Sequence, residues 1–332
     1  LPPDPTSCEV TVRTPVLLLC LCLAFPALAA DTLPPGEKPA PTPFSRLEDA
    51  GTAADHPGAD HVVVFEHAVN KVKPSGVTDV DGYSLTKILS PAGCRDRSVL
   101  NWHDDPQSQF RDVREVNVLR DGERIPVDVG AIHDLPAPQA AIYWRDRVKT
   151  LQLPRLRVGD GIEVVTFSKG FTYALLAQDG QAEAPDDEKY IPPMPGQYFD
   201  IVRFQGDAPI KEKRYELVLP VDKRLHAEVY NGALYSSVSY DAETTTYAWW
   251  CLDMPAMVHE PRQPDASDFV PKAVMATVES WEAKSRWFFD VNQGQFDVTP
   301  AIQAKVDEIL EDAGLSGAAD EKKAKALVHW VA

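Results

Sequence analysis

Apolar and polar residues alternate with a period of two over most of residues 61–250. Clear examples are Ile125, Val127 and Val129, Leu151 and Leu153, and Leu217 and Leu219. A β-strand with one buried face has this period, because successive side chains point to opposite sides of the sheet. The pattern therefore predicts many short strands, the first of which begins at the β-branched run His61-Val62-Val63-Val64-Phe65.

Glycine and proline mark the turns between these strands. Asp121-Gly122 separates two alternating runs and predicts a tight hairpin. Gly159-Asp160-Gly161 predicts a second turn, and Pro126 predicts an edge strand, because proline cannot donate a ladder hydrogen bond. The proline-rich residues 184–196 predict a long loop. We therefore expect a mainly β fold, with an antiparallel β-sandwich over residues 61–265.

Beyond residue 265 the period changes to that of helices. Ser280 is a suitable N-cap for a helix that carries Trp281 and Phe288 on one face. Thr299 followed by Pro300 predicts a second helix start, since a hydroxyl cap and proline at the first position both favour it. The apolar stripe of this second helix consists of Ile302, Val306, Ile309 and Leu310, and Gly314 is predicted to end it.

A third helical pattern occupies residues 320–332. Its apolar face consists of Ala324, Leu327, Val328 and Val331. No glycine, asparagine or proline follows to cap its last carbonyl groups, and the chain begins with Leu1 rather than methionine. We therefore expect a fragment of a longer protein, in which residues 266–332 form only the start of a helical domain.

The first sixty residues are predicted to lie outside the fold. Arg13, the apolar residues 15–25 and the small residues that end at Ala30 have the pattern of a secretory signal peptide over residues 1–30. Cleavage near Ala29 or Ala30 would deliver the protein to the periplasm or outside the cell. We expect Val12 to be the true start, with residues 1–11 untranslated. Residues 31–60 are rich in proline and alanine and predict a flexible linker.

The chain is acidic, with 50 acidic and 33 basic residues and a net charge of −17. This charge argues against nucleic acid as a partner, because nucleic-acid-binding proteins need a basic surface. It also argues against binding to anionic membranes. The apolar run of the signal peptide is too short for a comfortable membrane span, so no stable membrane insertion is expected.

The histidines and acidic residues do not have the spacing of a metal site. His61 and His67 could share a strand face, and His103 precedes two aspartates, but neither group has a close His-x-His or His-Glu-x-x-His pattern. Residues 79–82 (Asp-Val-Asp-Gly) lack the rest of a calcium loop and predict a β-turn. We expect no metal and no cofactor.

Cys94 and Cys251 are the only cysteines after the predicted signal peptide. Export would permit a disulfide between them, but their separation does not establish one. Cys251 stands eight residues before His259, yet its aromatic neighbours predict a buried strand cysteine rather than a nucleophile. Glu260 has two open interpretations, a structural carboxylate or a substrate contact. Likewise Trp249, Trp250, Trp281 and Trp287 either pack a domain junction or form a glycan platform.

An ordered set of segments resembles one family. The segments are residues 153–163, 215–220 and 254–261, then Pro271, Trp281 and Trp287, and finally residues 325–331. This set resembles exported bacterial transglutaminase-like proteins, which carry an N-terminal all-β domain of unknown function before a transglutaminase core. The resemblance covers roughly residues 61–332. Arg155 departs from it, because a glycine is expected at that position.

The resemblance implies an α+β core, similar to papain-like enzymes, in which a cysteine, a histidine and an aspartate perform acyl transfer or amide hydrolysis. None of these catalytic residues is expected within this chain, whose last helix would lie just before the segment that bears the nucleophile. The full protein would then act on a protein or peptide substrate. The alternative is a binding module for a periplasmic protein or envelope glycan, with an inactive core. A third hypothesis, catalysis by Cys251 within this chain, is not favoured.

Overall fold

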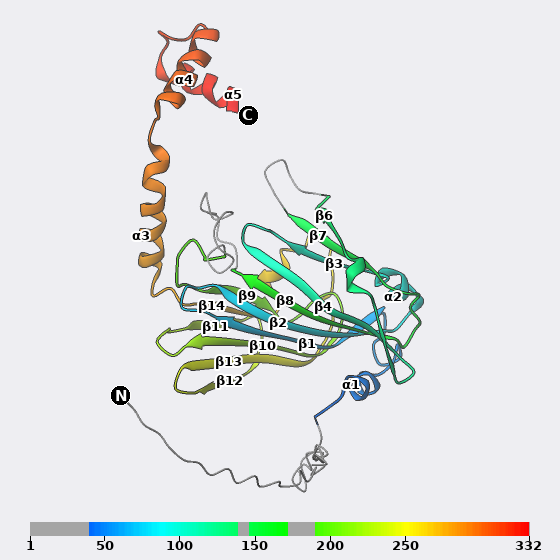
Figure 1. Cartoon of the computed structure of the whole chain (residues 1–332). Coiled ribbons are helices and arrows are strands. Elements are labelled where there is room, and N and C mark those ends of the chain that lie inside the picture. The colour runs from blue at the N-terminus through cyan, green and yellow to red at the C-terminus, as the bar shows by residue number, and fades with distance from the viewer. Residues whose placement is uncertain (1–39, 139–145, 172–189, 332) are drawn as a thin grey trace, which may run out of the picture. The chain divides into compact units, whose positions relative to one another are not determined.

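The computed structural model describes residues 40–138, 146–171 and 190–331 (Figure 1). The predicted signal peptide, the start of the predicted linker and the first part of the predicted loop at 184–196 lie outside the described residues. The described chain is mainly β, with several antiparallel sheets and few helices, which confirms the predicted fold class.

The largest sheet has eight strands in the order β12-β13-β10-β1-β2-β8-β4-β5 (Figure 1). In that order the strands span Tyr235–Tyr240, Thr244–Met254, Ile210–Pro220, His61–Val72, Thr78–Ile88, Gly161–Gly170, Gln109–Arg120 and Glu123–Pro126. Every pair is antiparallel except β1 and β10, which run parallel with Val63 opposite Ile210. This parallel pair joins the first half of the sheet to the second.

The predicted hairpin at Asp121-Gly122 is confirmed between β4 and β5. Asp121 and Gly122 have φ values of 52° and 81°, the left-handed conformation that this tight turn requires. Pro126 lies at the end of β5, the outermost strand, so the predicted edge position is also confirmed.

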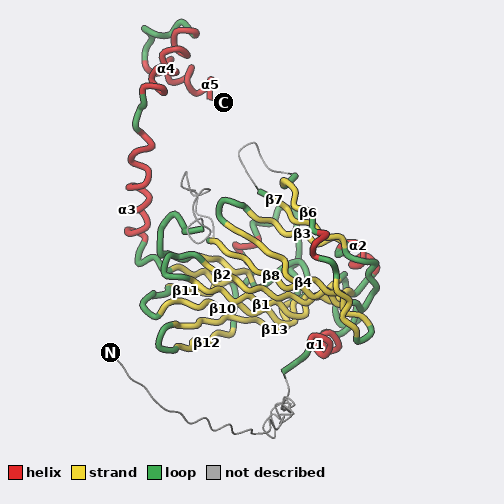
Figure 2. The backbone as a smooth tube through the Cα atoms, in the orientation of Figure 1, coloured by secondary structure: helices red, strands yellow, loops and turns green. Residues whose placement is uncertain are grey.

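Two three-stranded sheets pack against one face of the large sheet (Figure 2). The first consists of β11, β14 and β9, which span His226–Tyr230, Lys272–Ala276 and Phe199–Arg203. The second consists of β3, β7 and β6, which span Val99–Asp104, Arg147–Gln152 and His133–Pro136. We call the face that they cover the inner face. Apolar side chains fill the layer between the sheets at both ends of the large sheet.

Each small sheet has its own core cluster. Phe204, Leu217 and Met275 are among the buried side chains between the first small sheet and strands β10 and β13. Val116 and Leu151 belong to the second cluster, between the second small sheet and strands β4 and β8. The alternation of buried and exposed residues in the sequence therefore comes from a two-layer arrangement of sheets.

Helix α1, Pro43–Asp49, packs on part of the opposite face, which we call the outer face. Leu47 and Ala50 pack there against Val62, Leu85 and other buried residues. The prediction of a flexible linker over residues 31–60 is therefore wrong for this segment. The error arose because proline and alanine suggested little burial, whereas Pro43 is the first residue of α1 and Thr42 caps it.

The remaining helical elements are short. Near the sheets these are α2 (Pro91–Asp96) and the 3-10 turns η1 (Val129–Ala131) and η3 (Ala266–Asp268). Residues 281–331 form α3 (Trp281–Asn292), η4 (Gln293–Phe296), α4 (Pro300–Asp312) and α5 (Asp320–Val331). The predicted N-caps are confirmed, because the Ser280 and Thr299 hydroxyls each accept a 3.2 Å hydrogen bond from a first-turn amide. Among the described residues, none of the helices combines the length and apolarity needed to cross a membrane.

Candidate functional site

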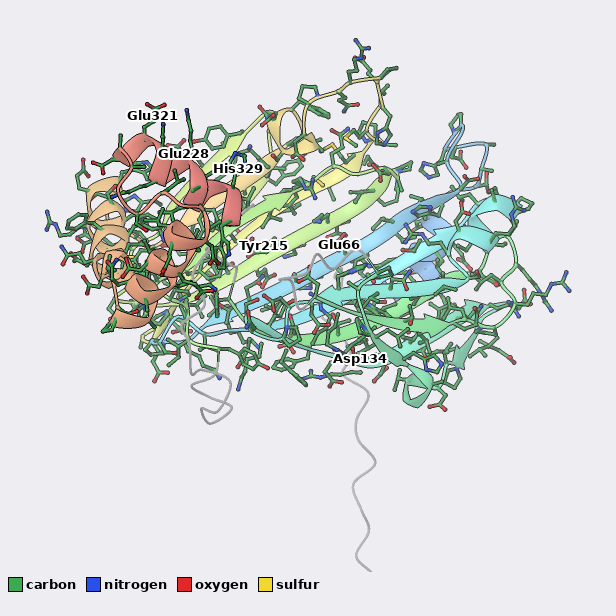
Figure 3. The ribbon with its side chains drawn as sticks, turned by 90° about the horizontal axis from the view of Figure 1, so that it is seen from above. Glu66, Asp134, Tyr215, Glu228, Glu321 and His329 are labelled. Carbon is green, nitrogen blue, oxygen red and sulfur yellow. The ribbon has the colours of Figure 1, made fainter. Side chains whose placement is uncertain are left out.

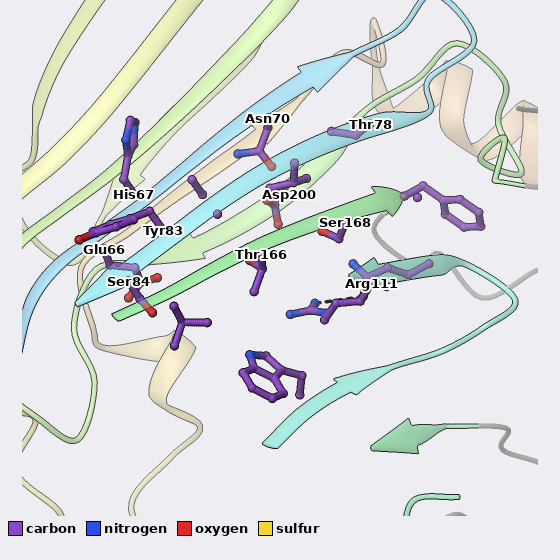
Figure 4. A pocket seen from close by; sticks show the side chains of 18 of the residues that line it. Glu66, His67, Asn70, Thr78, Tyr83, Ser84, Arg111, Thr166, Ser168 and Asp200 are labelled. Atoms are coloured by element: carbon purple, nitrogen blue, oxygen red, sulfur yellow. Dashed lines mark hydrogen bonds between the residues drawn. The ribbon is translucent and has the colours of Figure 1, made fainter. Parts of the chain in front are cut away.

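The middle of the inner face is polar, between the two apolar clusters. Here strands β1, β2, β8 and β4 form the floor of a cleft of about 510 Å³, and the two small sheets provide its walls (Figure 4). Its polar lining includes Glu66, Asn70, Thr78, Ser84, Gln109, Arg111, Thr166, Ser168, Tyr198 and Asp200. Polar side chains on the covered face of a sheet are unusual, because apolar residues can be buried there at a lower desolvation cost. Their presence suggests that they bind something. We take this cleft as the candidate functional site.

Asp200 of β9 accepts hydrogen bonds from two tyrosines at one wall of the cleft. Its Oδ2 atom lies 2.6 Å from the hydroxyl of Tyr215 and 3.3 Å from that of Tyr198, and the two hydroxyls also bond to each other. Its Oδ1 atom accepts the amide of Ile201 at 2.8 Å. Burial, and then the nearby carboxylate of Asp200, raise the pKa of the Tyr198 hydroxyl well above its ordinary value. The tyrosines therefore stay neutral donors that hold this carboxylate in place.

Arg111 of β4 lies on the floor of the same cleft (Figure 4). Its Nη2 atom donates a 3.1 Å hydrogen bond to Gln109, while its buried Nε has no hydrogen-bond partner. Burial lowers the pKa of the Arg111 guanidinium, which nevertheless remains protonated at neutral pH. The cleft thus contains a cation with N–H donors that are not used in hydrogen bonds within the described residues.

A second hollow of about 500 Å³ lies beside the cleft at Glu66. Both hollows are lined by Glu66, Ala68 and Asp200, so they are direct neighbours. Glu66 forms a 2.7 Å ion pair with Lys213 of the neighbouring strand β10. Figure 3 shows Glu66 and Tyr215 on these two strands. The combined groove therefore crosses the junction between β1 and β10.

Cys251 and His259 are not brought together. Cys251 is buried in β13, where its thiol donates a 3.5 Å hydrogen bond to the carbonyl of Phe204, and burial raises the pKa of the thiol. His259 is exposed and lies 3.0 Å from Asp207. The expectation that Cys251 is a buried strand cysteine is confirmed, because a thiol with a raised pKa and no base is a poor nucleophile.

Cys94 is half-buried in α2, at the edge of the cluster around Leu151. Cys251 belongs to the other cluster, around Phe204. Both cysteines are free. The open question of a disulfide is therefore answered, because the two thiols lie in different cores.

The histidines and acidic residues named from the sequence have structural partners. His61 contacts Arg97, and a β-bulge between Val63 and Phe65 reverses the alternation, which places His61 and His67 on opposite faces. The expectation of a shared face is therefore wrong. His103 is exposed, whereas Asp104 forms a 3.0 Å ion pair with Lys149.

The predicted turn at residues 79–82 is also wrong. These residues lie within strand β2. Asp79 pairs with Lys73 at 3.1 Å, and Asp81 pairs with Lys71 at 3.0 Å. Gly82 suggested a turn, but its role is to leave room, because a Cβ there would lie 2.5 Å from the Thr166 hydroxyl on the next strand. In the described part of the chain, no three His, Cys, Asp or Glu side chains are arranged to hold a metal.

The four tryptophans do not form one platform. Trp249 is buried in the inner core, whereas Trp250 stacks on Tyr235, with 5.7 Å between ring centroids. Trp281 is 84% exposed in α3, and Trp287 is half-buried. Glu260 is exposed.

No local pattern in the sequence indicates the cleft. Arg111 and Asp200 are separated by 89 positions, and each stands in an ordinary alternating strand. A possible clue was the run of polar residues at inner-face positions of β2 and β8, such as Ser84, Thr166 and Ser168. That clue requires knowing which face is covered, and periodicity alone does not say so.

A solved structure with a similar fold comes from Parabacteroides distasonis ATCC 8503, described as "a putative protease". The two chains have 13% identical residues and a TM-score of 0.63, over 82% of this chain and 50% of that one. This chain thus spans about half the length of that protein. At this identity the likeness establishes the fold alone.

Two other solved structures match less well. An M1 zinc metallopeptidase from Deinococcus radiodurans has 12% identity and a TM-score of 0.32, over 66% of this chain and 43% of that one. Legionella pneumophila aminopeptidase A, in complex with aspartic acid, has 10% identity and a TM-score of 0.31, over 68% of this chain and 22% of that one. These TM-scores are too low to indicate a shared fold.

Among curated proteins there is no match to this chain. The family model of DUF3857, a domain of unknown function with a solved structure, matches residues 74–258. The match runs from the end of β1 to just beyond β13, and so includes most of the cleft floor. It covers more than half of the 332 residues. The chain belongs to the DUF3857 family.

Proposed function

We propose that this chain is the non-catalytic, peptide-binding part of a longer exported protein that performs Cys-dependent acyl transfer or amide hydrolysis. In this proposal the β domain, which runs from β1 to β14 and so extends past the predicted boundary at residue 265, binds the peptide substrate in its polar cleft. The helices from α3 onward begin a transglutaminase-like core that carries the catalytic cysteine, histidine and aspartate further along the chain. Residues 1–30 act as the signal peptide, and the mature protein works in the periplasm or outside the cell.

The observation that carries the proposal is the cleft itself. Its floor presents hydroxyl groups from Ser84, Thr166 and Ser168, which can pair with the N–H and C=O groups of a bound peptide. The groove continues past Glu66 across the sheet, and this length suits an extended chain better than a compact small molecule. The mostly polar lining of the cleft also argues against a hydrophobic ligand.

The helices support the proposal that a core follows. Trp281, Phe289 and Val328 are each more than 60% exposed, and Leu310 is the single buried residue among the described side chains of α3, α4 and α5. Helices with such exposed apolar residues need a partner surface. The further chain of a transglutaminase-like core would supply it, as the family resemblance implies.

A second candidate function is glycan binding by the same cleft. The observation that favours it is Trp102 of β3, a half-buried aromatic side chain among the polar lining residues. An aromatic ring beside hydroxyl and amide groups can stack on a sugar. The sugar would then come from an envelope glycan, and the core would be inactive.

The two functions can be separated by a binding experiment on the purified chain. The probes are a library of N-acetylated hexapeptides and a set of N-acetylglucosamine oligomers. We expect the immobilised chain to retain peptides and not the oligomers. Ser168→Trp, which fills the cleft floor, should abolish retention, whereas Ser237→Trp on the exposed edge strand β12 should not.

If the chain retains the sugar oligomers and no peptides, glycan binding is the function of the cleft and peptide binding is rejected. Thiol-dependent amidase activity of the chain that Cys251→Ala removes would contradict its non-catalytic role.

A further inference from the structure

We propose that Arg111 binds a carboxylate group of the peptide, either its C-terminus or an acidic side chain. This inference rests on the proposed peptide-binding function and names the class of peptide that the cleft prefers. A guanidinium forms its strongest and most directional hydrogen bonds with a carboxylate, through two parallel N–H groups.

The first argument is that Arg111 lacks an ionic partner. Among the described residues, no carboxylate lies within ion-pair distance of its guanidinium. Arg120, on the same strand, is different, because it forms a 2.6 Å pair with the buried Asp160. A half-buried cation that has lost part of its hydration without gaining a counter-ion is costly, and a ligand that supplies the counter-ion would offset that cost.

The second argument is that the guanidinium has donors available. Only Nη2 is used, in a hydrogen bond to the neutral side chain of Gln109. Nε is buried and has no acceptor. An arginine has five N–H donors, so enough remain for a ligand with two acceptor oxygens.

The third argument is that the acidic groups nearby already have partners. Glu66 is paired with Lys213, and Asp104 is paired with Lys149. Asp200 accepts the hydroxyls of two tyrosines. Asp104 acts on Arg111 only from beyond ion-pair distance, and its ion pair is with Lys149. Within the described residues, Arg111 is therefore a cation of the cleft without a direct ion pair, in a protein with net charge −17.

The surroundings also favour a carboxylate over a phosphate. Arg111 is flanked by Thr166 and Ser168, which offer hydroxyl donors but no second positive charge. A single guanidinium with hydroxyl neighbours matches one negative charge on two coplanar oxygens. A phosphate has up to two charges and three acceptor oxygens, and would be held better by several cations.

The test compares acid and amide forms of the same peptide. Peptides retained by the full chain from the N-acetylated hexapeptide library are synthesised with a free C-terminal carboxylate and with a C-terminal amide. Calorimetry then measures both dissociation constants. For a peptide without acidic side chains, we expect the amide to bind about tenfold more weakly or worse, as for the loss of a charged hydrogen-bonded pair.

Three variants assign the effect to Arg111. Arg111→Gln should remove the difference between acid and amide, and Arg111→Lys should retain only part of it. Arg114→Gln is the matched control, because Arg114 is on the same strand but packs over Phe167 on the outer face. That control should keep the full difference. Circular dichroism confirms that each variant is folded.

Several outcomes would overturn the inference. One such outcome is that the acid and amide forms bind with equal affinity and that acidic side chains in the peptide do not change the affinity either. Peptide binding would then stand, but the role of Arg111 would be rejected. The same holds if the difference persists in Arg111→Gln. Inorganic phosphate that displaces the peptide at micromolar concentration would point to a phosphate ligand instead. If no peptide of either form binds, both the inference and the proposed function fail.

Discussion

The hydroxyl of Tyr215 donates a 2.6 Å hydrogen bond to the carboxylate of Asp200 and so joins the large sheet to the first small sheet. Both tyrosines that contact Asp200 are buried, and neither carries a charge at neutral pH. The bond therefore has two consequences. It stabilises the packing of the two sheets, and it keeps one carboxylate at a defined position in the cleft wall.

We expect Tyr215→Phe to lower the free energy of unfolding by about 2 kcal/mol, because the half-buried carboxylate of Asp200 loses a hydrogen bond from a buried hydroxyl. Urea denaturation followed by circular dichroism measures this change. Tyr240→Phe is the control, since that hydroxyl is on an exposed edge strand, and its stability should not change. An unchanged midpoint for Tyr215→Phe would mean that the bond does not stabilise the sheets.

Arg111→Met should raise the free energy of unfolding by about 1 kcal/mol, because a partly desolvated cation without a counter-ion is removed. The matched comparison is Arg120→Met on the same strand. This change leaves Asp160, which is 3% exposed, without its cation and should cost about 3 kcal/mol. If Arg111→Met is as destabilising as Arg120→Met, Arg111 has a structural counter-ion after all.

Acid should destabilise the protein partly through His61. Burial, followed by the nearby Arg97, lowers the pKa of His61 to about 4. Asp60, Asp96 and Asp207 act in the opposite direction but are weaker. As the pH falls below about 6.5, the unfolded chain binds a proton that the folded ring does not accept until the pH approaches 4.

Stability is therefore lost between these two pH values. The His61 contribution at pH 5 should be about 1 kcal/mol, once solvent screening of the partly exposed ring is allowed for. Urea denaturation at pH 7 and pH 5 should give a smaller difference for His61→Asn than for the parent chain. His133→Asn, at an exposed position, should leave the difference unaltered. A His61→Asn chain that is as acid-sensitive as the parent would disprove this role.

The two free cysteines should differ in reactivity. Cys94 is half-buried, whereas Cys251 is buried, bonded to the Phe204 carbonyl and has a raised thiol pKa. In the native protein at pH 8, iodoacetamide should modify Cys94 at least tenfold faster than Cys251, because the thiolate is the reactive species. Peptide mass spectrometry measures both rates. In urea the two rates should become similar. Equal rates in the folded protein would contradict the burial of Cys251.

Much of the secondary structure could be predicted from the sequence, because it depends on neighbouring residues. Alternation predicted the strands, Asp121-Gly122 predicted the hairpin, and the Ser280 and Thr299 hydroxyls predicted two helix starts. Errors occurred where a local signal had another cause. Gly82 is in a strand because a neighbouring strand needs the space of its missing side chain, and such a requirement leaves no mark in the adjacent sequence.

The candidate site could not be predicted in this way. Arg111, Asp200 and Tyr215 come from three strands that the sheet topology brings together, and β9 is not even in the same sheet as the other two. Nothing in the sequence predicts that β1 pairs with β10 in parallel. The cleft depends on this pairing, because it determines which side chains face Asp200.

The parallel pair β1 and β10 also has a consequence for how the chain folds. Most other strands in the large sheet join a partner that is near in sequence, whereas Val63 meets Ile210 only after a loop of roughly 150 residues has closed. Most members of each apolar cluster come from one half of the sheet, so we expect each half to collapse before the two halves join. The groove between Arg111 and Lys213 would then be completed only when β1 pairs with β10. In that folding order, a ligand bound along the groove would hold the two halves of the sheet together.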